Sequence, residues 1–454
     1  MKNIVIAQSV LELKFLLNRI SKIDNLYFLP LNLEVQLYCM EKKISYLNPI
    51  FYTNKKFHHQ AIVASQNMIK KIQFDNSYRT SEKINVVSFL RFYFNSIIYL
   101  IEIINKIDSE ENINKIYVSG WFNYKDTFSN ENYYISFILK NLFRKKVVEV
   151  TQQNIRLPKS NYKIQYLIKT KKFDKNSKII ILSNIGYNFF RILKYLFKKK
   201  EKLLIFIPQD LKIPIFKKII FKILRIQFFS LEKLRSSKKI SFKLPKVQYK
   251  CGKYNISKLL NFRINQEKNN ILKNKLQFNS FEKFFSDAKP FLVIANNSRG
   301  LDGLILDFAY KKNIPFLCIP HGTLSQYFNK FDCLYKKIIS ESITYPKSTF
   351  VAQSMISKNF FIQQKNNYKN MFLCGNILFA EKNIFKNKKN KKILYAVTMK
   401  DFNNIQYLGV EMFYEFLDNL TMLNNLALSH NLDILVKNHP TIYAYSKILK
   451  NLFK

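Results

Sequence analysis

Two short segments place a histidine just after an apolar run that is typical of a buried strand. In the first segment, "FLCIPHGT", His321 is followed by Gly322 and Thr323. Open parallel sheets bind ligands in the loops at the carboxyl ends of their strands. An imidazole in such a loop can act as a general base or donate a hydrogen bond to a phosphate, and Gly322 lets the backbone approach a ligand closely. A single histidine can equally cap its own loop by bonding a backbone carbonyl.

The second segment, "ILVKNHP", carries Lys437 and His439 at the end of another predicted strand. Residues two apart on an extended chain project to the same side, so this pair could hold an anionic phosphate. An ordinary polar strand end has the same pattern. The chain contains only five histidines, and finding two of them at strand ends of this kind favours a functional role.

A third polar turn, "NNSRGLDG", follows the apolar run "FLVIA" and leads into a predicted helix over residues 301–311. Its Ser298 and Arg299 could meet an anion at the helix N-terminus. Asp302 could serve as a general base, although the helix dipole also favours a carboxylate in the first turn. Asp307, one turn further on, is expected on a solvated face. The glycine spacing differs from G-x-G-x-x-G, which excludes a dinucleotide-binding fingerprint.

Other common catalytic motifs are missing from the sequence. It has no G-x-S-x-G elbow, Walker A lysine, H-E-x-x-H pair or clustered metal carboxylates. The five cysteines are scattered and lack C-x-x-C spacing, which predicts reduced thiols and no structural zinc. We therefore expect neither a cofactor nor a metal.

Short apolar runs alternate with helical patterns along most of the chain, and this alternation predicts parallel sheets with helices on both faces, a doubly wound α/β fold. The polar, basic stretch 236–280 is typical of a connector or an insertion. The cationic run "KNKKNKK" at residues 386–392 is typical of a joint between domains. We expect residues 1–385 to form an N-terminal Rossmann-like domain and residues 386–454 to begin a second one.

The charge balance favours anionic partners. The chain has 75 Lys and Arg against 30 Asp and Glu, a formal net charge of +45, which suits phosphates, anionic lipid or nucleic acid. Part of this charge can be solvated background, because Lys and Asn are abundant throughout. The sequence has no helix-turn-helix, zinc finger or RNP-like aromatic motif, so we expect no nucleic-acid partner.

Two segments bear on membranes. Residues 213–229, "IPIFKKIIFKILRIQFF", predict a basic amphipathic helix with Lys218, Lys222 and Arg225 on one side. Such a helix can lie in a membrane interface, and a surface helix that buries its apolar face on a sheet fits equally well. The apolar stretch 86–104 contains polar and charged residues that are costly in a bilayer, so we expect a buried or surface-lying helix. Because the N-terminus lacks the features of a secretion signal, we expect a cytoplasmic protein.

Taken in order, "IPHGT", "MFLCGN", "KKILYAVT" and "ILVKNHP" resemble the bacterial surface-polysaccharide transferases of GT-B fold. That group includes capsule polysaccharide enzymes, CDP-glycerol glycerophosphotransferases and sialyl- or Kdo-type transferases, and the resemblance covers residues 291–443. It implies two Rossmann-like domains, residues 1–385 on the acceptor side and residues 386–454 on the donor side. Together they would transfer a sugar from a nucleotide-activated donor to a cell-surface or lipid-linked glycan, in a cytoplasmic protein that is peripheral at the inner membrane. By this resemblance His321 stands near the reaction centre in the interdomain cleft, and Lys437 and His439 hold the donor's phosphates.

The chain departs from the family pattern in two ways. "YAVTMKD" lacks the proline and the arginine that glycerophosphotransferases show after this strand, which disfavours that branch. The family also continues past K-x-H-P through several βα units, whereas this chain ends at Lys454. We therefore expect an incomplete second domain. Two alternatives stay open: a nucleotide-sugar 2-epimerase on the same scaffold, and a non-catalytic glycan- or membrane-binding protein.

Overall fold

The fold was described from a computed structural model of the 454-residue chain. It describes residues 1–20, 22–120, 124–125, 132–133, 135–150, 164–169, 178–183, 192–193, 203–209, 215–235, 242–286, 289–320, 329–330, 333–334, 340, 344–346, 348–363, 371–375, 391–396 and 409–437.

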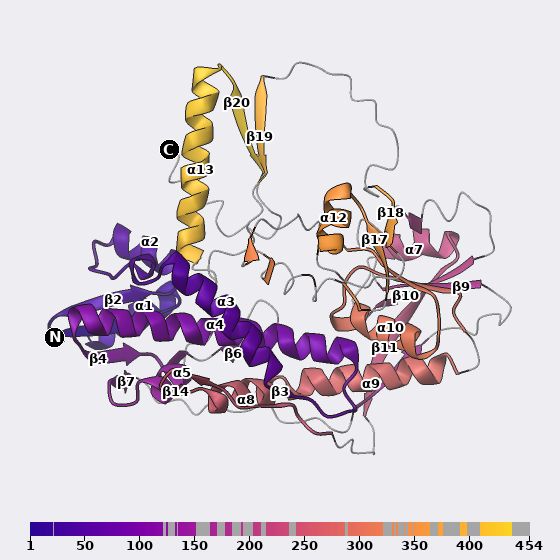
Figure 1. Cartoon of the computed structure of the whole chain (residues 1–454), viewed down its shortest axis with the longest axis horizontal. Coiled ribbons are helices and arrows are strands. Elements are labelled where there is room, and N and C mark those ends of the chain that lie inside the picture. The colour runs from indigo at the N-terminus through magenta and orange to yellow at the C-terminus, as the bar shows by residue number, and fades with distance from the viewer. Residues whose placement is uncertain are drawn as a thin grey trace.

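The N-terminal part is built on a four-stranded parallel sheet in the order β2–β1–β4–β7 (Figure 1). Its strands are β1 (Lys2–Ala7), β2 (Leu26–Pro30), β4 (Ile113–Val118) and β7 (Val147–Glu149). Helices α1 (Val10–Ile20) and α2 (Leu33–Glu41) share a core with Val5 and Ala7. Ile4 and Ile6 belong to a second core, to which α3 (Lys55–Lys70), α4 (Thr80–Glu111) and α5 (Ile135–Leu142) contribute. Alternate residues of β1 therefore bury their side chains on opposite faces, as strand geometry requires.

The second sheet has eight strands in the order β18–β17–β16–β15–β9–β10–β11–β8, and all neighbouring pairs except β11 and β8 are parallel. Its strands are β8 (Ile164–Lys169), β9 (Lys178–Leu182), β10 (Leu203–Gln209), β11 (Ile226–Arg235), β15 (Leu292–Ala295), β16 (Phe316–Cys318), β17 (Thr349–Ala352) and β18 (Met371–Leu373). Ile179 and Ile181 share a core with α9 (Lys268–Phe284) and α10 (Gly300–Lys311), whereas Ile180 and Leu182 share one with α7 (Ile215–Ile223). Helices thus cover both faces, and α12 (Met355–Gln363) packs beside β17 and β18.

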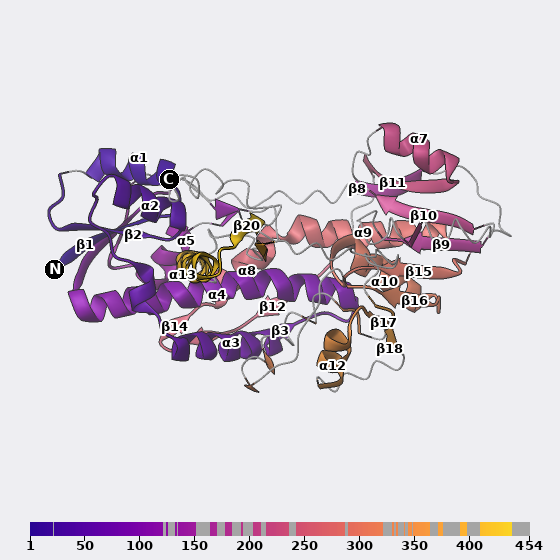
Figure 2. The ribbon, with the colours of Figure 1, turned by 90° about the horizontal axis from the view of Figure 1, so that it is seen from above.

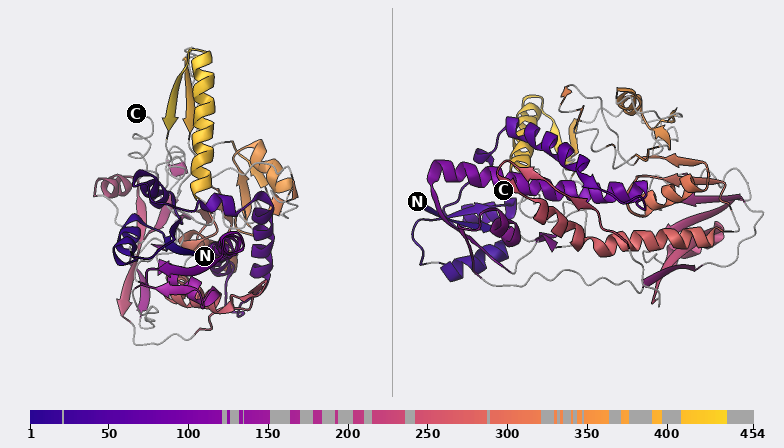
Figure 3. Two further views of the ribbon diagram at one scale, coloured as in Figure 1. Left: turned by 90° about the vertical axis from the view of Figure 1, so that its left-hand side faces the viewer. Right: turned by 60° about the horizontal axis from the view of Figure 1, so that its bottom comes forward.

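Long helices join the two sheets (Figure 2 and the right panel of Figure 3). The helix α4 has 32 residues and is the one helix in the described part of the chain that is long and apolar enough to cross a membrane. However, 83% of its most apolar 18-residue stretch is buried inside the protein. The prediction that residues 86–104 form a buried helix is therefore confirmed. The segment 236–280, described from residue 242, forms β12 (Lys246–Val247), β13 (Lys250–Cys251), β14 (Tyr254–Asn255), α8 (Ser257–Gln266) and most of α9. The buried side chains of α8 join the first core and most of those of α9 join the second.

A third unit consists of β19 (Lys392–Ala396), α13 (Gly409–Ser429) and β20 (Asp433–Lys437), with the two strands paired in parallel. Figure 1 and the left panel of Figure 3 show it rising away from the two larger sheets. The remaining elements are η1 (Pro49–Tyr52), β3 (Ile72–Gln73), which pairs with β12, and the short hairpin of β5 (Tyr124–Lys125) and β6 (Asn132–Tyr133).

The prediction of a doubly wound α/β fold is confirmed. The described residues of 1–385 form two larger sheets, of four and eight strands, and three two-stranded ones, and the position of the domain boundary stays a prediction. The predicted basic helix over 213–229 is wrong in its last third, because α7 ends at Ile223 and residues 226–229 belong to β11. Arg225 takes a left-handed φ of 52° that ends the helix. The β-branched and aromatic run after it pairs with β10 as a strand.

Candidate functional site

The order of strands in the eight-stranded sheet reverses between β9 and β15. From β9 the chain winds outward through β10 to β11, whereas β15, on the other side of β9, leads outward through β16 and β17 to β18. Open α/β sheets bind ligands in the crevice outside the carboxyl ends of the strands at such a reversal. The loops that follow β9 and β15 therefore form the candidate site.

The loop after β15 is folded back on the first turn of α10 by side-chain hydrogen bonds. The Asn297 Nδ2 group donates to Asp302 Oδ2 at 2.6 Å and to Asn296 Oδ1 at 2.8 Å. The Oδ1 atom of the same asparagine accepts from the Arg299 N–H at 2.8 Å. Ser298 between them is fully buried. The predicted residues Ser298, Arg299 and Asp302 are thus brought together in one ordered turn.

Two glycines allow α10 to lie close to this turn and to α4. Gly300 has a left-handed φ of 55°, and its N–H donates to Asn85 Oδ1 of α4 at 3.0 Å. A Cβ atom on Gly303 would lie 2.2 Å from the Ser298 carbonyl oxygen and 2.6 Å from the Ser81 Cβ atom. Any side chain at position 303 would therefore push the loop and α4 away from α10.

The electrostatics of the turn suit an anion. Burial lowers the pKa of the Arg299 guanidinium, and the nearby Asp302 carboxylate partly offsets this effect. Arg299 precedes the first turn of α10, and the dipole at the N-terminus of this helix attracts negative charge.

Ser183 lies beside this turn, at the end of β9. Its N–H donates to the Ile294 carbonyl at 3.0 Å, which fixes it next to the end of β15. Its side chain is 3% exposed, and its Oγ atom has no hydrogen-bond partner among the described residues. A buried hydroxyl without a partner is costly. A cation, a hydroxyl and a helix N-terminus at one strand reversal together suit a phosphate group.

The H-G-T turn lies outside the described residues, but the chain leading to it is described. This turn comprises His321, Gly322 and Thr323. The Ile319 N–H donates to the Ala295 carbonyl at 2.8 Å, and Gln353 Nε2 donates to the Pro320 carbonyl at 2.5 Å. The described chain up to Pro320 therefore follows β16, the parallel neighbour of β15, whose own loop carries Arg299.

The K-x-H-P turn is only partly described. Lys437 is exposed at the end of β20, and His439 lies outside the described residues. In the part of the chain that the structure describes, β20 pairs only with β19. The structure therefore places Lys437 at the exposed end of the two-stranded β19–β20 sheet.

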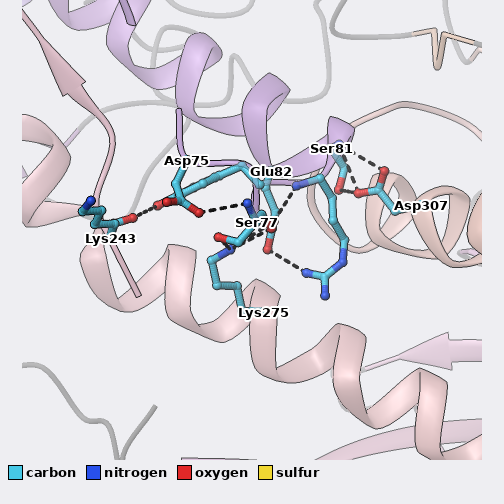
Figure 4. Close-up of polar contacts among 9 residues, drawn as sticks. Asp75, Ser77, Ser81, Glu82, Lys243, Lys275 and Asp307 are labelled. Carbon is cyan, nitrogen blue, oxygen red and sulfur yellow. Dashed lines mark hydrogen bonds and ion pairs between the residues drawn. The ribbon is translucent and has the colours of Figure 1, made fainter. Parts of the chain in front are cut away.

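Asp307, predicted on a solvated face, is instead buried at the N-terminus of α4 (Figure 4). Its carboxylate accepts from the Ser81 N–H at 3.1 Å, from the Ser81 hydroxyl and from the Tyr345 hydroxyl at 2.7 Å. Burial raises its pKa against the opposite effect of these hydrogen bonds. The sequence does carry a signal for this, because an acidic residue between Leu306 and Phe308 has apolar neighbours that belong in a core.

Glu82, in the first turn of α4, connects the same helix end to α9 (Figure 4). Its carboxylate accepts from the Arg79 N–H at 2.8 Å, pairs with the Arg79 guanidinium at 3.1 Å, and lies 3.5 Å from Lys275 Nζ. Burial lowers the pKa of Lys275, and Glu82 partly restores it. The N-terminus of α4 is thus held by both α9 and α10, which places it close to the candidate site. These contacts give Glu82 and Lys275 a structural role that sequence reasoning missed.

Within the described residues, no group of three or more His, Cys, Asp or Glu side chains could hold a metal ion. No family model and no curated protein matches the sequence. Among solved structures, the UDP-GlcNAc 2-epimerase from Methanocaldococcus jannaschii is similar, with 15% sequence identity and a TM-score of 0.29. The match covers 61% of this chain and 69% of that chain.

Proposed function

We propose that this chain is a glycosyltransferase of GT-B type that moves a sugar from a nucleotide-activated donor to a cell-surface polysaccharide or lipid-linked glycan. We place it at the cytoplasmic face of the inner membrane, where such acceptors are assembled. The ordered motifs that resemble surface-polysaccharide transferases support this reaction class.

One structural observation carries the proposal: a turn suited to an anion stands at the strand reversal, and the strand β16, after which the sequence carries the H-G-T motif, is the parallel neighbour of the strand before that turn. Arg299, Ser298 and Ser183 supply the groups that a phosphate needs. His321 follows β16, the parallel neighbour of β15. A turn that can bind phosphate, on the strand next to the one that leads to His321, is an arrangement that a nucleotide-sugar transferase can use.

In the proposed reaction, His321 accepts the proton of an acceptor hydroxyl as its oxygen attacks the anomeric carbon of the donor sugar. The bond from that carbon to the nucleotide phosphate breaks, and the phosphate leaves with the electron pair. Cations stabilise the charge that develops on the leaving group, an electrostatic contribution. The resemblance assigns that role to Lys437 and His439, and the turn before α10 adds Arg299. Asp302 ranks second as the base.

The test is a panel of nucleotide sugars added to the purified chain. We expect at least one UDP-, GDP-, CMP- or CDP-linked sugar to raise the thermal unfolding midpoint, since a ligand at one hundred times its Kd adds about 2.7 kcal/mol of stability. Arg299→Gln should weaken that shift, whereas Arg144→Gln, an exposed arginine after α5, should leave it unchanged. His321→Ala should keep binding and lower transfer by roughly a hundredfold or more.

Transfer is measured as incorporation of labelled donor sugar into lipid-extractable or polymeric material. Wild-type turnover in both His321→Ala and His439→Ala would exclude the assigned roles. Interconversion of the donor sugar without an acceptor would favour the 2-epimerase. If no nucleotide sugar binds at all, the non-catalytic alternative replaces the proposal.

A further inference from the structure

The helix α7 presents a wide apolar stripe to solvent. Ile215, Ile219 and Ile223 stand four residues apart, and Phe216 and Ile220 lie beside them on the same side of the helix. These five side chains are between 42% and 76% exposed. A surface helix normally turns its apolar stripe toward the core. Here the stripe points outward, which calls for a partner.

The opposite side of α7 is firmly attached to the sheet. Phe221 is 2% exposed and shares a core with Ile180, Ile205 and Ile226. Figure 2 shows α7 as the outermost element over β10 and β11. The packing of Phe221 therefore fixes the orientation of the helix, and the five exposed side chains cannot turn inward without removing it.

Positive charge flanks the stripe. Lys218 and Lys222 are exposed, one turn apart, along its edge, and Arg225 is exposed just beyond the end of the helix. Residues 213–229 contain no Asp or Glu, and the whole chain carries a formal charge of +45. An apolar stripe edged by cations is complementary to an anionic bilayer, whose surface attracts the cations while its acyl region takes up the apolar side chains.

We propose that α7 docks this protein on the surface of an anionic phospholipid bilayer, with the helix lying in the interface plane. The helix α13 shows why charge decides the partner. It also exposes large apolar side chains, Met422 at 64% and Leu428 at 73%, but its sequence contains three acidic and no basic residues. The two helices therefore resemble each other in exposed apolar surface and differ in charge, and only the basic α7 is attracted to an anionic bilayer. The proposal is independent of the transfer reaction, because a protein that transfers no sugar can still bind vesicles.

The experiment is co-sedimentation of the full chain with vesicles of phosphatidylcholine alone and of phosphatidylcholine mixed with phosphatidylglycerol. We expect binding to the mixed vesicles only. The double variant Ile219→Ser/Ile223→Ser should weaken it on the order of tenfold or more, and Lys218→Gln/Lys222→Gln should weaken it most at low salt. The matched control is Met422→Ser/Leu428→Ser, which removes two equally exposed apolar side chains from α13 and should leave binding unchanged. Unchanged thermal midpoints confirm that each variant is folded.

Three outcomes would overturn the proposal. Equal binding to both vesicle types would show that bilayer charge plays no part. Equal losses in the α7 and α13 variants would show general stickiness rather than docking through α7. The third outcome is that the wild-type chain does not bind vesicles but forms a dimer, and that Ile219→Ser/Ile223→Ser dissociates this dimer. The apolar stripe would then contact a second copy of the chain.

Discussion

At the scale of single residues, the candidate site depends on a position that has no side chain. Gly303→Ala would place a methyl group 2.2 Å from the Ser298 carbonyl oxygen and 2.6 Å from the Ser81 Cβ atom. Because backbone and a neighbouring helix must move, we expect a loss of about 3 kcal/mol in the free energy of unfolding. Gly300→Ala meets no atom within 4 Å but must keep a φ of 55°, so it should lose about 1 kcal/mol. Urea titration of both variants gives the comparison, and equal losses would contradict the close approach at position 303.

Some residues of the site could be predicted from sequence and others could not. Ser298, Arg299 and Asp302 follow a strand and open a helix, and local spacing is enough to place them together. The role of Asp307 depends on Ser81, 226 residues away in the chain, and no local pattern encodes that pairing. The buried hydroxyl of Ser183 is likewise significant only because β9 lies beside β15.

At the scale of elements, the N-terminus of α1 is sensitive to pH. Glu12 accepts from the Gln8 N–H at 2.7 Å, and its own N–H donates to Ser9 Oγ at 3.1 Å, which caps the helix. Burial raises the pKa of Glu12 from its ordinary value of 4.5 to about 7, against the lowering effect of the hydrogen bonds. A raised pKa means that the side chain's contribution to stability is complete below about pH 4.5 and is lost as pH rises through about 7.

The variant Glu12→Gln removes this titration and keeps an oxygen for the cap. We therefore expect wild type to lose stability relative to the variant between about pH 5 and 8, by roughly 3 kcal/mol at most. Thermal unfolding midpoints of both proteins across that range measure the difference. A difference that stays constant with pH would show that Glu12 does not titrate in this window.

Elements with a clear period were predicted well, and their ends less so. The predicted helix 301–311 corresponds to α10, and the apolar run "FLVIA" before it contains β15. The prediction of one helix over 213–229 was wrong because the apolar pattern of α7 continues through "ILRIQFF", although the chain becomes a strand at Ile226. Only the left-handed backbone at Arg225 separates the two elements, and a non-glycine residue gives little local warning of that conformation.

At the scale of the whole molecule, alternation of strands and helices predicted parallel sheets but not how many. Local patterns do not indicate which strands pair, so residues 1–385 were assigned one domain, although their described part contains two separate larger sheets, of four and eight strands, besides three two-stranded ones. The reversal between β9 and β15 follows from that pairing order and could not be located from sequence. The contact between the two cores at the N-terminus of α4 could not be predicted from sequence either. There α4 packs in the first core, while α10 and Tyr345 belong to the second.

The contact of Asp307 in α10 with Ser81 in α4 leads to a prediction about how the two larger sheets unfold. Asp307→Ala would leave the Ser81 N–H, the Ser81 hydroxyl and the Tyr345 hydroxyl without their acceptor in a buried place, and we expect a loss of about 3 kcal/mol or more. Because the lost contacts join α4 of the first core to α10 of the second, amide hydrogens near residue 81 should lose protection from exchange first, and unfolding of the two sheets should become less coupled. Asp307→Asn keeps an acceptor oxygen for Ser81 and should stay closer to wild type. Exchange that rises equally over all strands in Asp307→Ala would contradict a local effect of this contact and indicate general loss of stability instead.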